Sequence, residues 1–347
     1  MAKTLLSPQG KTRLKAYLNQ VYAAVNAAVG EEFEVEPSVQ QRLYEKAAEH
    51  GAWFLKLINV ETVAQIKGEK VGLAVSGLLT KRTNTDNNDR KTSSVVSESK
   101  SGYECQFTEV DVHITYSKLD KWRNRTPQQY AELYSSIYRK AMTDDRIRIG
   151  WHGTSIAAET NPEENPNGED VNKGWIQKVR DEAAEQIDED GLTFGHVDAD
   201  MRNLDVVVES AKQMIPEHLR DDSQLMAFVS SDLMADYRLN SLAANGDQAS
   251  EKVLVNDNKV MAVFAGLKAV TPPFFPSGTV IVTYPENLSI YLQEGSLRRH
   301  IKDNPTRSRV EDYNSENVDY IVEEPEAIGI ITNVTQYEEA EAEAEAE

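Results

Sequence analysis

Residues 103–116 read YECQFTEVDVHITY, and this stretch indicates how the chain folds around it. Its odd- and even-numbered residues form two alternating sets, with a change of face near Val110, and such a period of two is typical of a β-strand. Before it, residues 60–75 hold short β-prone runs interrupted by glycines. Between them, residues 81–90, KRTNTDNNDR, contain no apolar residue. We therefore predict a long β-hairpin over residues 60–116 with a polar centre.

The predicted hairpin is longer than a compact domain needs. An arm of about fifteen residues spans about 50 Å at 3.3 Å per residue. A hairpin of this length cannot bury both faces within its own chain, so we expect it to lie across another molecule, most economically a second copy. Its cations Lys67, Lys70, Lys81 and Arg82 would then meet acidic surface on that neighbour. A surface insertion without a partner is the alternative.

The first thirty residues differ in composition from the rest of the chain. They carry four basic residues and no acidic one. Their apolar residues recur at three- and four-residue spacings, which predicts one face of a helix that ends at Gly30. The residues of this face are Leu14, Leu18, Val21, Tyr22, Val25 and Val29. Such a basic amphipathic helix could dock on a partner, could be removed later, or could pack as a surface helix on its own domain.

A second long helix is predicted over residues 126–151. Thr126 is a fitting N-cap and Pro127 a fitting first-turn residue, and the apolar residues from Tyr130 to Ala141 fall on one face. Further predicted helices cover residues 38–50, 172–186, 201–214 and 231–239, and further predicted strands cover residues 225–229, 280–284, 288–292, 318–322 and 328–331. The alternation of strand and helix beyond residue 170 indicates a separate α/β unit.

Composition limits the class of protein. The chain has 347 residues, is 40% apolar and has a formal net charge of −20, so it can form a large core but repels nucleic-acid phosphates. We therefore expect no sequence-reading DNA-binding function. The single cysteine, Cys105, excludes an intrachain disulfide and fits a reducing cytosol. No stretch is apolar enough to predict a membrane span or a signal peptide.

Motifs of catalysis are absent from the sequence. The six histidines lack the spacing of a zinc protease, and Leu78 stands where a phosphate-binding loop would need a lysine. Cys105 has no basic neighbour in sequence and predicts an unreactive structural thiol. Acidic pairs are Asp144-Asp145, Glu163-Glu164, Asp198 with Asp200, and Asp221-Asp222. In a chain with 57 acidic residues we interpret these pairs as solvated surface, and we expect no catalytic residue, cofactor or metal site.

Many short stretches resemble the major capsid proteins of contractile-tailed temperate phages, the P2-like family. The matching stretches run in the same order from about residue 33 to residue 323. They include FEVEPSV at 33–39, KGEKVG at 67–72, GWIQK at 174–178, ENLSIY at 286–291 and RVEDYNSENVDYIVE at 309–323. The segments that depart from the family pattern are the hairpin tip at 81–90, the acidic loop at 159–170 and the Glu/Ala-rich end of the chain.

The resemblance implies an α+β chain with the Hong Kong 97-like capsid fold of tailed phages. Carried over, it gives an N-terminal helical arm, an extension loop, a peripheral domain with a long spine helix over 126–151, and an axial domain around the capsomer centre. The expected boundaries are 1–59 for the arm, 60–116 for the extension loop, 117–194 for the peripheral domain, 195–291 for the axial domain, 292–337 for further peripheral-domain strands, and 338–347 for a disordered acidic tail.

The resemblance also implies a function and partners. We expect a virion protein, assembled in the host cytoplasm, whose copies form the hexamers and pentamers of an icosahedral head around double-stranded DNA. The expected partners are other copies, a scaffolding protein, a maturation protease that trims the arm, and a portal protein, with no membrane. Alternatives are an encapsulin-like shell, a ring protein of the tail, and a hydrolase that uses an acidic pair. Covalent Lys–Asn crosslinks between subunits are a further option.

Overall fold

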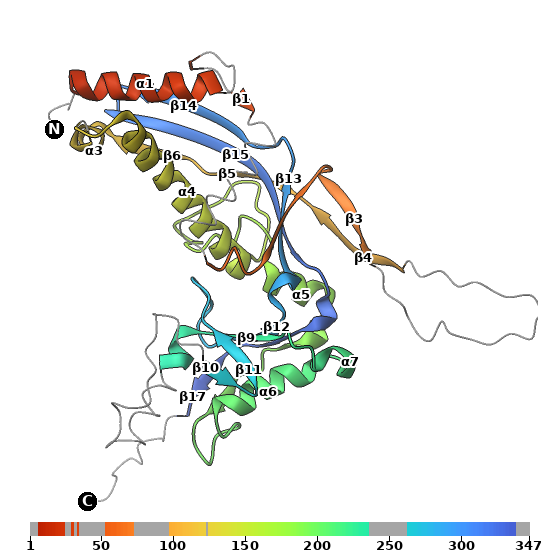
Figure 1. The fold of residues 1–347 in the computed structure, drawn as a ribbon. Coiled ribbons are helices and arrows are strands. Elements are labelled where there is room, and N and C mark those ends of the chain that lie inside the picture. The colour runs from red at the N-terminus through yellow and green to blue at the C-terminus, as the bar shows by residue number, and fades with distance from the viewer. Residues whose placement is uncertain are drawn as a thin grey trace, which may run out of the picture.

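The structure is a computed structural model of the whole chain. It describes residues 6–24, 29–30, 33–34, 53–72, 97–122, 124–235 and 262–337. Within this part the chain is a mixed α+β protein built on two main sheets, and a hairpin extends sideways from their junction (Figure 1). The predicted helix at 38–50 and the hairpin tip lie outside the described residues.

A seven-stranded sheet forms the upper half of the molecule. Its main path runs β1-β14-β15-β13-β2, and β5 and β6 pair with β15. The strands are β1 (Phe33–Glu34), β2 (Asn59–Val63), β5 (Gln106–Glu109), β6 (Val112–Thr115), β13 (Leu288–Gln293), β14 (Arg298–Asn304) and β15 (Arg309–Val322). The fourteen-residue β15 is the longest strand of the sheet and is hydrogen-bonded to four others. It therefore fixes the register of this half.

Three helices pack at one side of this sheet: α1 (Pro8–Ala24), α3 (Tyr116–Lys121) and α4 (Pro127–His152) (Figure 1). The predicted start of α4 is confirmed, because the Thr126 hydroxyl accepts from the Gln129 N–H and the Gln129 side chain accepts from the Thr126 N–H, both at 3.3 Å. Of the possibilities for α1, the structure shows packing on its own domain. Leu14, Tyr17 and Tyr130 are buried together between α1 and α4.

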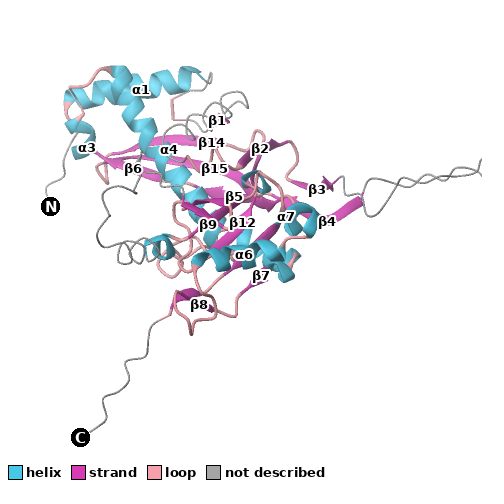
Figure 2. Cartoon of the chain, turned by 60° about the horizontal axis from the view of Figure 1, so that its bottom comes forward, coloured by secondary structure: helices cyan, strands magenta, loops and turns pink. Residues whose placement is uncertain are grey.

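A six-stranded sheet forms the lower half, in the order β10-β11-β9-β12-β16-β7. Its strands are β7 (Ile187–Asp188), β9 (Met226–Val229), β10 (Ala262–Phe264), β11 (Leu267–Val270), β12 (Val280–Thr283) and β16 (Ile328–Ile331). The helices α6 (Leu204–Met214) and α7 (Glu217–Arg220) lie beside it, and β8 (Leu192–Phe194) pairs with β17 (Val334–Gln336) at its margin (Figures 1 and 2). The predicted strand and helix at 225–235 are confirmed, and the remainder of that helix lies outside the described residues.

The structure divides the last strands between the sheets differently from our expectation for residues 292–337. Only β14 and β15 of that range belong to the seven-stranded sheet, together with β13, which begins at residue 288. The chain then crosses over, and β16 pairs with β12, with Ile331 opposite Val280. The reason is burial. Every residue of β12 is buried, so its backbone N–H and C=O groups need hydrogen-bond partners on both edges, and β9 and β16 supply them.

The predicted hairpin of residues 60–116 is too long at its root, because β2 runs parallel to β13 and residues 106–115 pair with β15. Among the described residues, the paired strands of the hairpin are β3 (Lys67–Gly72) and β4 (Ser97–Glu104). The change of face lies after Cys105 and not near Val110, because Cys105 is buried and from residue 106 onward the even-numbered side chains are the more buried. At this point the Cys105 N–H donates to Ile66 O at 2.8 Å, and the chain leaves the hairpin to join β15.

Candidate functional site at the root of the hairpin

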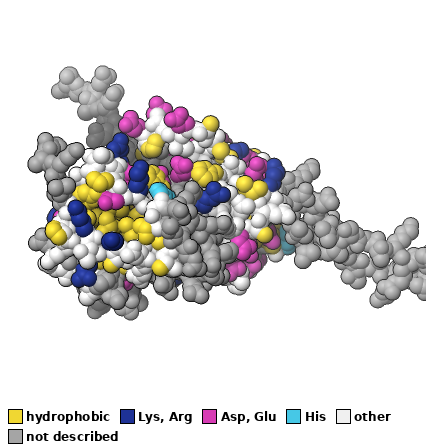
Figure 3. Space-filling model, turned by 90° about the horizontal axis from the view of Figure 1, so that it is seen from above, with side chains coloured by type: hydrophobic (Ala, Val, Ile, Leu, Met, Phe, Trp, Pro, Cys, Tyr) yellow, Lys and Arg dark blue, Asp and Glu magenta, His cyan; other side chains and the backbone are white. Residues whose placement is uncertain are grey.

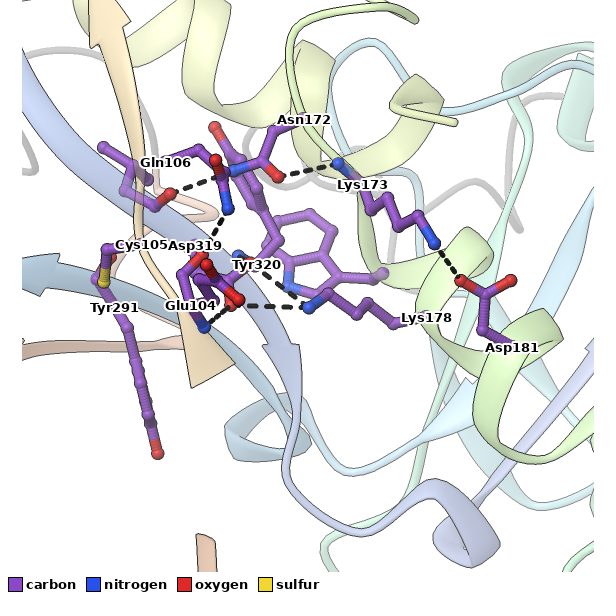
Figure 4. A network of polar contacts seen from close by, with 12 residues as sticks. Glu104, Cys105, Gln106, Asn172, Lys173, Lys178, Asp181, Tyr291, Asp319 and Tyr320 are labelled. Carbon is purple, nitrogen blue, oxygen red and sulfur yellow. Dashed lines mark hydrogen bonds and ion pairs between the residues drawn. The ribbon is translucent and has the colours of Figure 1, made fainter. Parts of the chain in front are cut away.

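The carboxylate of Asp319 is at the centre of the hairpin root (Figure 4). It lies on β15 and is 1% exposed. Its Oδ2 accepts the N–H of Glu104, the last residue of β4, at 2.9 Å, and its Oδ1 accepts the N–H of Tyr320 at 2.9 Å. Lys178 Nζ, from the helix α5 (Trp175–Glu182), lies 3.3 Å from Asp319 Oδ1. One carboxylate thus joins the hairpin, the sheet and a helix.

The helix α5 is held at this position by contacts at its N-terminus. Asn172 Nδ2 donates to Val318 O at 2.9 Å, and Trp175 Nε1 donates to Ser289 O at 2.9 Å. The chain before α5 also passes very close to α4. A Cβ at Gly150 would lie 2.5 Å from the Trp175 ring, and one at Gly174 would lie 2.4 Å from Gly150 O. Glycine is therefore required at both positions for Lys178 to reach Asp319.

The electrostatics of the root reflect burial. Burial raises the pKa of Asp319 above its ordinary value, although Lys178 opposes the shift. Burial also raises the pKa of the Cys105 thiol to about 12, which agrees with the prediction of an unreactive structural thiol. In contrast, Glu104 is exposed, and its hydrogen bond from Lys67 Nζ, 2.8 Å long, lowers its pKa. Lys67, predicted to meet a neighbouring copy, thus pairs across its own hairpin.

Two further buried ion pairs lie along the same strand. Arg146 of α4 contacts both carboxylate oxygens of Glu316, and the two side chains are 6% and 3% exposed. Arg299 of β14 lies 2.6 Å from Asp312, whose side chain is fully buried, and it also donates to Tyr17 of α1. Together with Asp319, these carboxylates connect β15 to four other elements.

Sequence reasoning missed these three carboxylates. They occur in the stretch RVEDYNSENVDYIVE, which resembles the family but has no hydrophobic alternation over its first half. One signal was available, since Asp312 and Glu316 stand an even number of residues apart in a predicted β-rich region and so share a face. Acidic residues on one face of a central strand require buried cationic partners.

An aromatic cluster joins the two halves of the molecule. Trp151 of α4 and Trp175 of α5 stand edge to face with ring centroids 4.8 Å apart, and Phe54 packs on both. Phe228 of β9, from the six-stranded sheet, lies 6.0 Å from Phe54. These rings belong to one buried core that includes residues of both sheets. The hairpin root is therefore anchored on a continuous core.

Two of the acidic pairs weighed as catalytic candidates lie on the exposed surface of the protein. Asp200 is exposed and accepts hydrogen bonds from Thr193, which lower its pKa, and Asp198 is exposed beside His196. Glu163 and Glu164 lie on an exposed loop. Within the described part of the chain, no three His, Cys, Asp or Glu side chains are grouped so that they could hold a metal ion. Among the helices described, none combines the length and hydropathy needed to cross a bilayer.

Comparison with known proteins identifies relatives over nearly the whole chain. The family model described as phage major capsid protein, P2 family, matches residues 12–334. The capsid protein of Escherichia phage P2 is 33% identical over 335 residues, which cover 90% of this chain and 92% of that protein. The major capsid protein of Serratia phage KSP20 is 30% identical, with 92% and 93% covered. A chain of the satellite phage P4 procapsid that includes the size determination (Sid) protein matches with a TM-score of 0.68 at 29% identity, covering 85% of this chain and 99% of that one.

Proposed function

Because the chain belongs to the P2 family of phage major capsid proteins, we propose that its copies form hexamers and pentamers in which the β3–β4 hairpin of one copy lies across the next. The protein is a structural component of the phage capsid with the Hong Kong 97-like fold, and not an enzyme. This assignment sets aside the hydrolase, ring-protein and encapsulin-like alternatives.

The observation that supports the proposal is the unpartnered hairpin. Within the described residues, β3 and β4 form a two-stranded sheet of their own, which extends away from the body (Figure 1). An isolated two-stranded hairpin is marginally stable in water at best. Contact with a neighbouring copy provides the missing surface, and closure of a shell repeats that contact many times.

We propose the domain roles on the same basis. The seven-stranded sheet with α4 as its spine helix forms the peripheral domain, and the six-stranded sheet forms the axial domain near the capsomer centre. The strand pairing supports placing residues 328–331 with the axial sheet, and residues 334–336 pair with β8 beside it. The shell would enclose double-stranded DNA without reading its sequence, which suits a chain of net charge −20.

Assembly in the host cytoplasm would involve a scaffolding protein, a portal protein and a maturation protease. The packing of α1 adds a physical constraint on trimming. If the protease removes the N-terminal arm, Leu14 and Tyr17 leave a buried cluster, and Arg299 loses the Tyr17 hydroxyl as an acceptor. Trimming would therefore loosen the end of the peripheral domain where α1, α3 and α4 meet.

Electron microscopy of the purified protein tests the proposal. The wild-type chain, expressed with its scaffold, should form closed shells with fivefold and sixfold capsomers. A variant in which Glu69–Gly102 is replaced by a short Gly-rich turn should fold but remain unassembled, and its fold is checked by the protection of Cys105 from alkylation. The wild-type chain, expressed with the scaffold under the same conditions, is the reference for assembly. Normal shells from the hairpin variant would refute the proposed role.

A further inference from the structure

The end of the molecule where α1 meets α3 is basic, although the whole chain is strongly acidic. Asp120 of α3 joins it to the start of α1, because it accepts the Ser7 N–H at 3.1 Å and the Ser7 hydroxyl at 2.5 Å. Tyr116 N donates to Ser308 O and joins α3 to the β14–β15 turn. We call the cations on these helices and the following loop the basic corner. They are Lys11, Arg13, Lys15, Lys118, Lys121 and Arg125.

The cations of the basic corner are available for binding. Five of the six are exposed and Arg13 is half-buried. None of them forms an ion pair with another described residue, in contrast to the cations at the hairpin root and along β15. Viewed onto this side, Lys and Arg side chains gather around an apolar patch (Figure 3). Asp120 and Asp303, two carboxylates on adjoining elements, accept hydrogen bonds from Ser7 and Tyr116 and form no ion pair with these cations. An acidic ligand would therefore find unpaired positive charge here.

We propose that the basic corner binds the Glu/Ala-rich segment 338–347 of another copy of this chain. That segment carries six Glu and no basic residue. In an extended chain, alternate side chains on one side are about 7 Å apart. This matches the rise of about 6 Å between Lys11 and Lys15, which stand one helical turn apart on the exposed side of α1. Ion pairs of this kind contribute mainly to specificity and to the association rate.

The arrangement of the fold makes this contact intermolecular. Segment 338–347 follows β17 at the margin of the six-stranded sheet, whereas the basic corner lies at the opposite end of the molecule (Figures 1 and 2). Ten residues span at most about 36 Å. The strand β15 starts beside α3, with Arg309 opposite Thr115, and leads toward the six-stranded sheet. This strand alone is about 43 Å long, so the segment cannot reach the basic corner of its own copy.

Duplex DNA is a less suitable ligand for this surface. DNA is stiff over about 150 base pairs, so a long duplex reaches past the corner, and the net charge of −20 on the whole chain repels its phosphates. A ten-residue peptide contacts the corner alone. The charge of the chain therefore favours the peptide over the nucleic acid.

Fluorescence anisotropy tests the inference on protein that lacks residues 338–347, so that it does not depend on shell assembly. A labelled peptide of residues 337–347 should bind, and the triple variant Lys118→Gln, Lys121→Gln, Arg125→Gln should weaken binding at least tenfold. The matched control Lys56→Gln, Arg202→Gln, Lys268→Gln removes the same charge from exposed positions elsewhere and should change binding less than twofold. A peptide with Gln for every Glu should not bind.

Three outcomes would overturn the inference: no binding of the peptide, equal losses in the two triple variants, or binding of a twelve-base-pair duplex at the corner in place of the peptide. A second measurement uses the full-length protein. Shells made from a mixture of ¹⁴N- and ¹⁵N-labelled subunits, treated with a carbodiimide, should give mixed-isotope crosslinks between segment 338–347 and peptides of α1 or α3. Crosslinks within single subunits alone would also overturn it.

Discussion

Replacement of Asp319 by Ala should release the hairpin from the body of the subunit. The substitution removes the acceptor of the Glu104 N–H and leaves Lys178, whose side chain is 16% exposed, without its partner. Removing one member of a buried ion pair costs about 3–5 kcal/mol of unfolding free energy. We expect about 3 kcal/mol, the lower end of this range, because the Lys178 amine can reach solvent.

Hydrogen exchange at the Glu104 amide measures the local effect directly. A hydrogen bond to a charged acceptor contributes about 1.5–3 kcal/mol, so exchange at this amide should accelerate about 10- to 150-fold in Asp319→Ala. Asp319→Asn keeps an acceptor and should cost only about 1 kcal/mol. The raised pKa of Asp319 gives the reason, because it shows that burial disfavours the charge more than Lys178 favours it.

The same shift has a consequence for pH. The native state holds the Asp319 proton more tightly than the unfolded chain, whose aspartates titrate near 3.9. Titration of Asp319 thus adds stability that is complete below about pH 3.9 and is lost as the pH rises through the raised native pKa. Asp319→Asn should remove this component from urea unfolding curves measured between pH 3.5 and pH 7.

The matched control is Asp181→Ala, on the helix α5 that also carries Lys178. Asp181 pairs with Lys173 at 2.7 Å, but both side chains are about 40% exposed, so the change should cost less than about 1 kcal/mol. The reasoning is refuted if Asp319→Ala leaves Glu104 exchange unchanged. It is also refuted if Asp319→Asn is as damaging as Asp319→Ala, because the charge and not the acceptor would then hold the hairpin.

Three further predictions concern other parts of the subunit. Glu316→Ala should lower the free energy of unfolding in urea by about 3–5 kcal/mol, because it leaves the Arg146 guanidinium buried and unpaired. The double variant Arg146→Met, Glu316→Leu should recover most of that loss. A double variant as unstable as the single one would contradict this reasoning. Gly329→Ala should lower the free energy of unfolding, measured by thermal denaturation, by about 3 kcal/mol or more, since its Cβ would lie 1.9 Å from Ala211 O. Unchanged stability would show that β16 and α6 are less closely packed. At pH 8, Cys105 should be about 0.01% thiolate and resist alkylation in the native protein but react fully in urea; rapid native labelling would contradict its pKa of about 12.

The sequence predicted most helices and strands but not how the strands are shared between the sheets. Helix α4 was predictable because a local signal, the Thr126 cap followed by an apolar face, specifies it. Only residues 318–322 of β15 were predicted, because its first half, RVEDYNSEN, contains a single aliphatic side chain. The buried face of that half holds Asp312, Asn314 and Glu316, so hydrophobic periodicity does not detect it.

The hairpin root was unpredictable for a related reason. The face change after Cys105 occurs where the strand exchanges one partner for another, from β3 to β15. Alternation within a single strand contains no information about which strand lies beside it. The same holds for Lys67, whose partner Glu104 is 37 residues away in sequence and is determined only by the register of the hairpin.

The concentration of buried carboxylates on β15 is consistent with a subunit whose shape must be the same in every copy. Apolar side chains of similar size would stabilise the fold as well or better, but they tolerate small shifts between elements. A bidentate contact such as Arg146 with Glu316 is satisfied in one register alone. The three pairs fix α4, β14 and α5 against one strand, and the third also fixes the hairpin. If the hairpin lies across the next copy as proposed, each error in its angle is repeated around the closed shell, so these ion pairs serve uniform geometry more than stability.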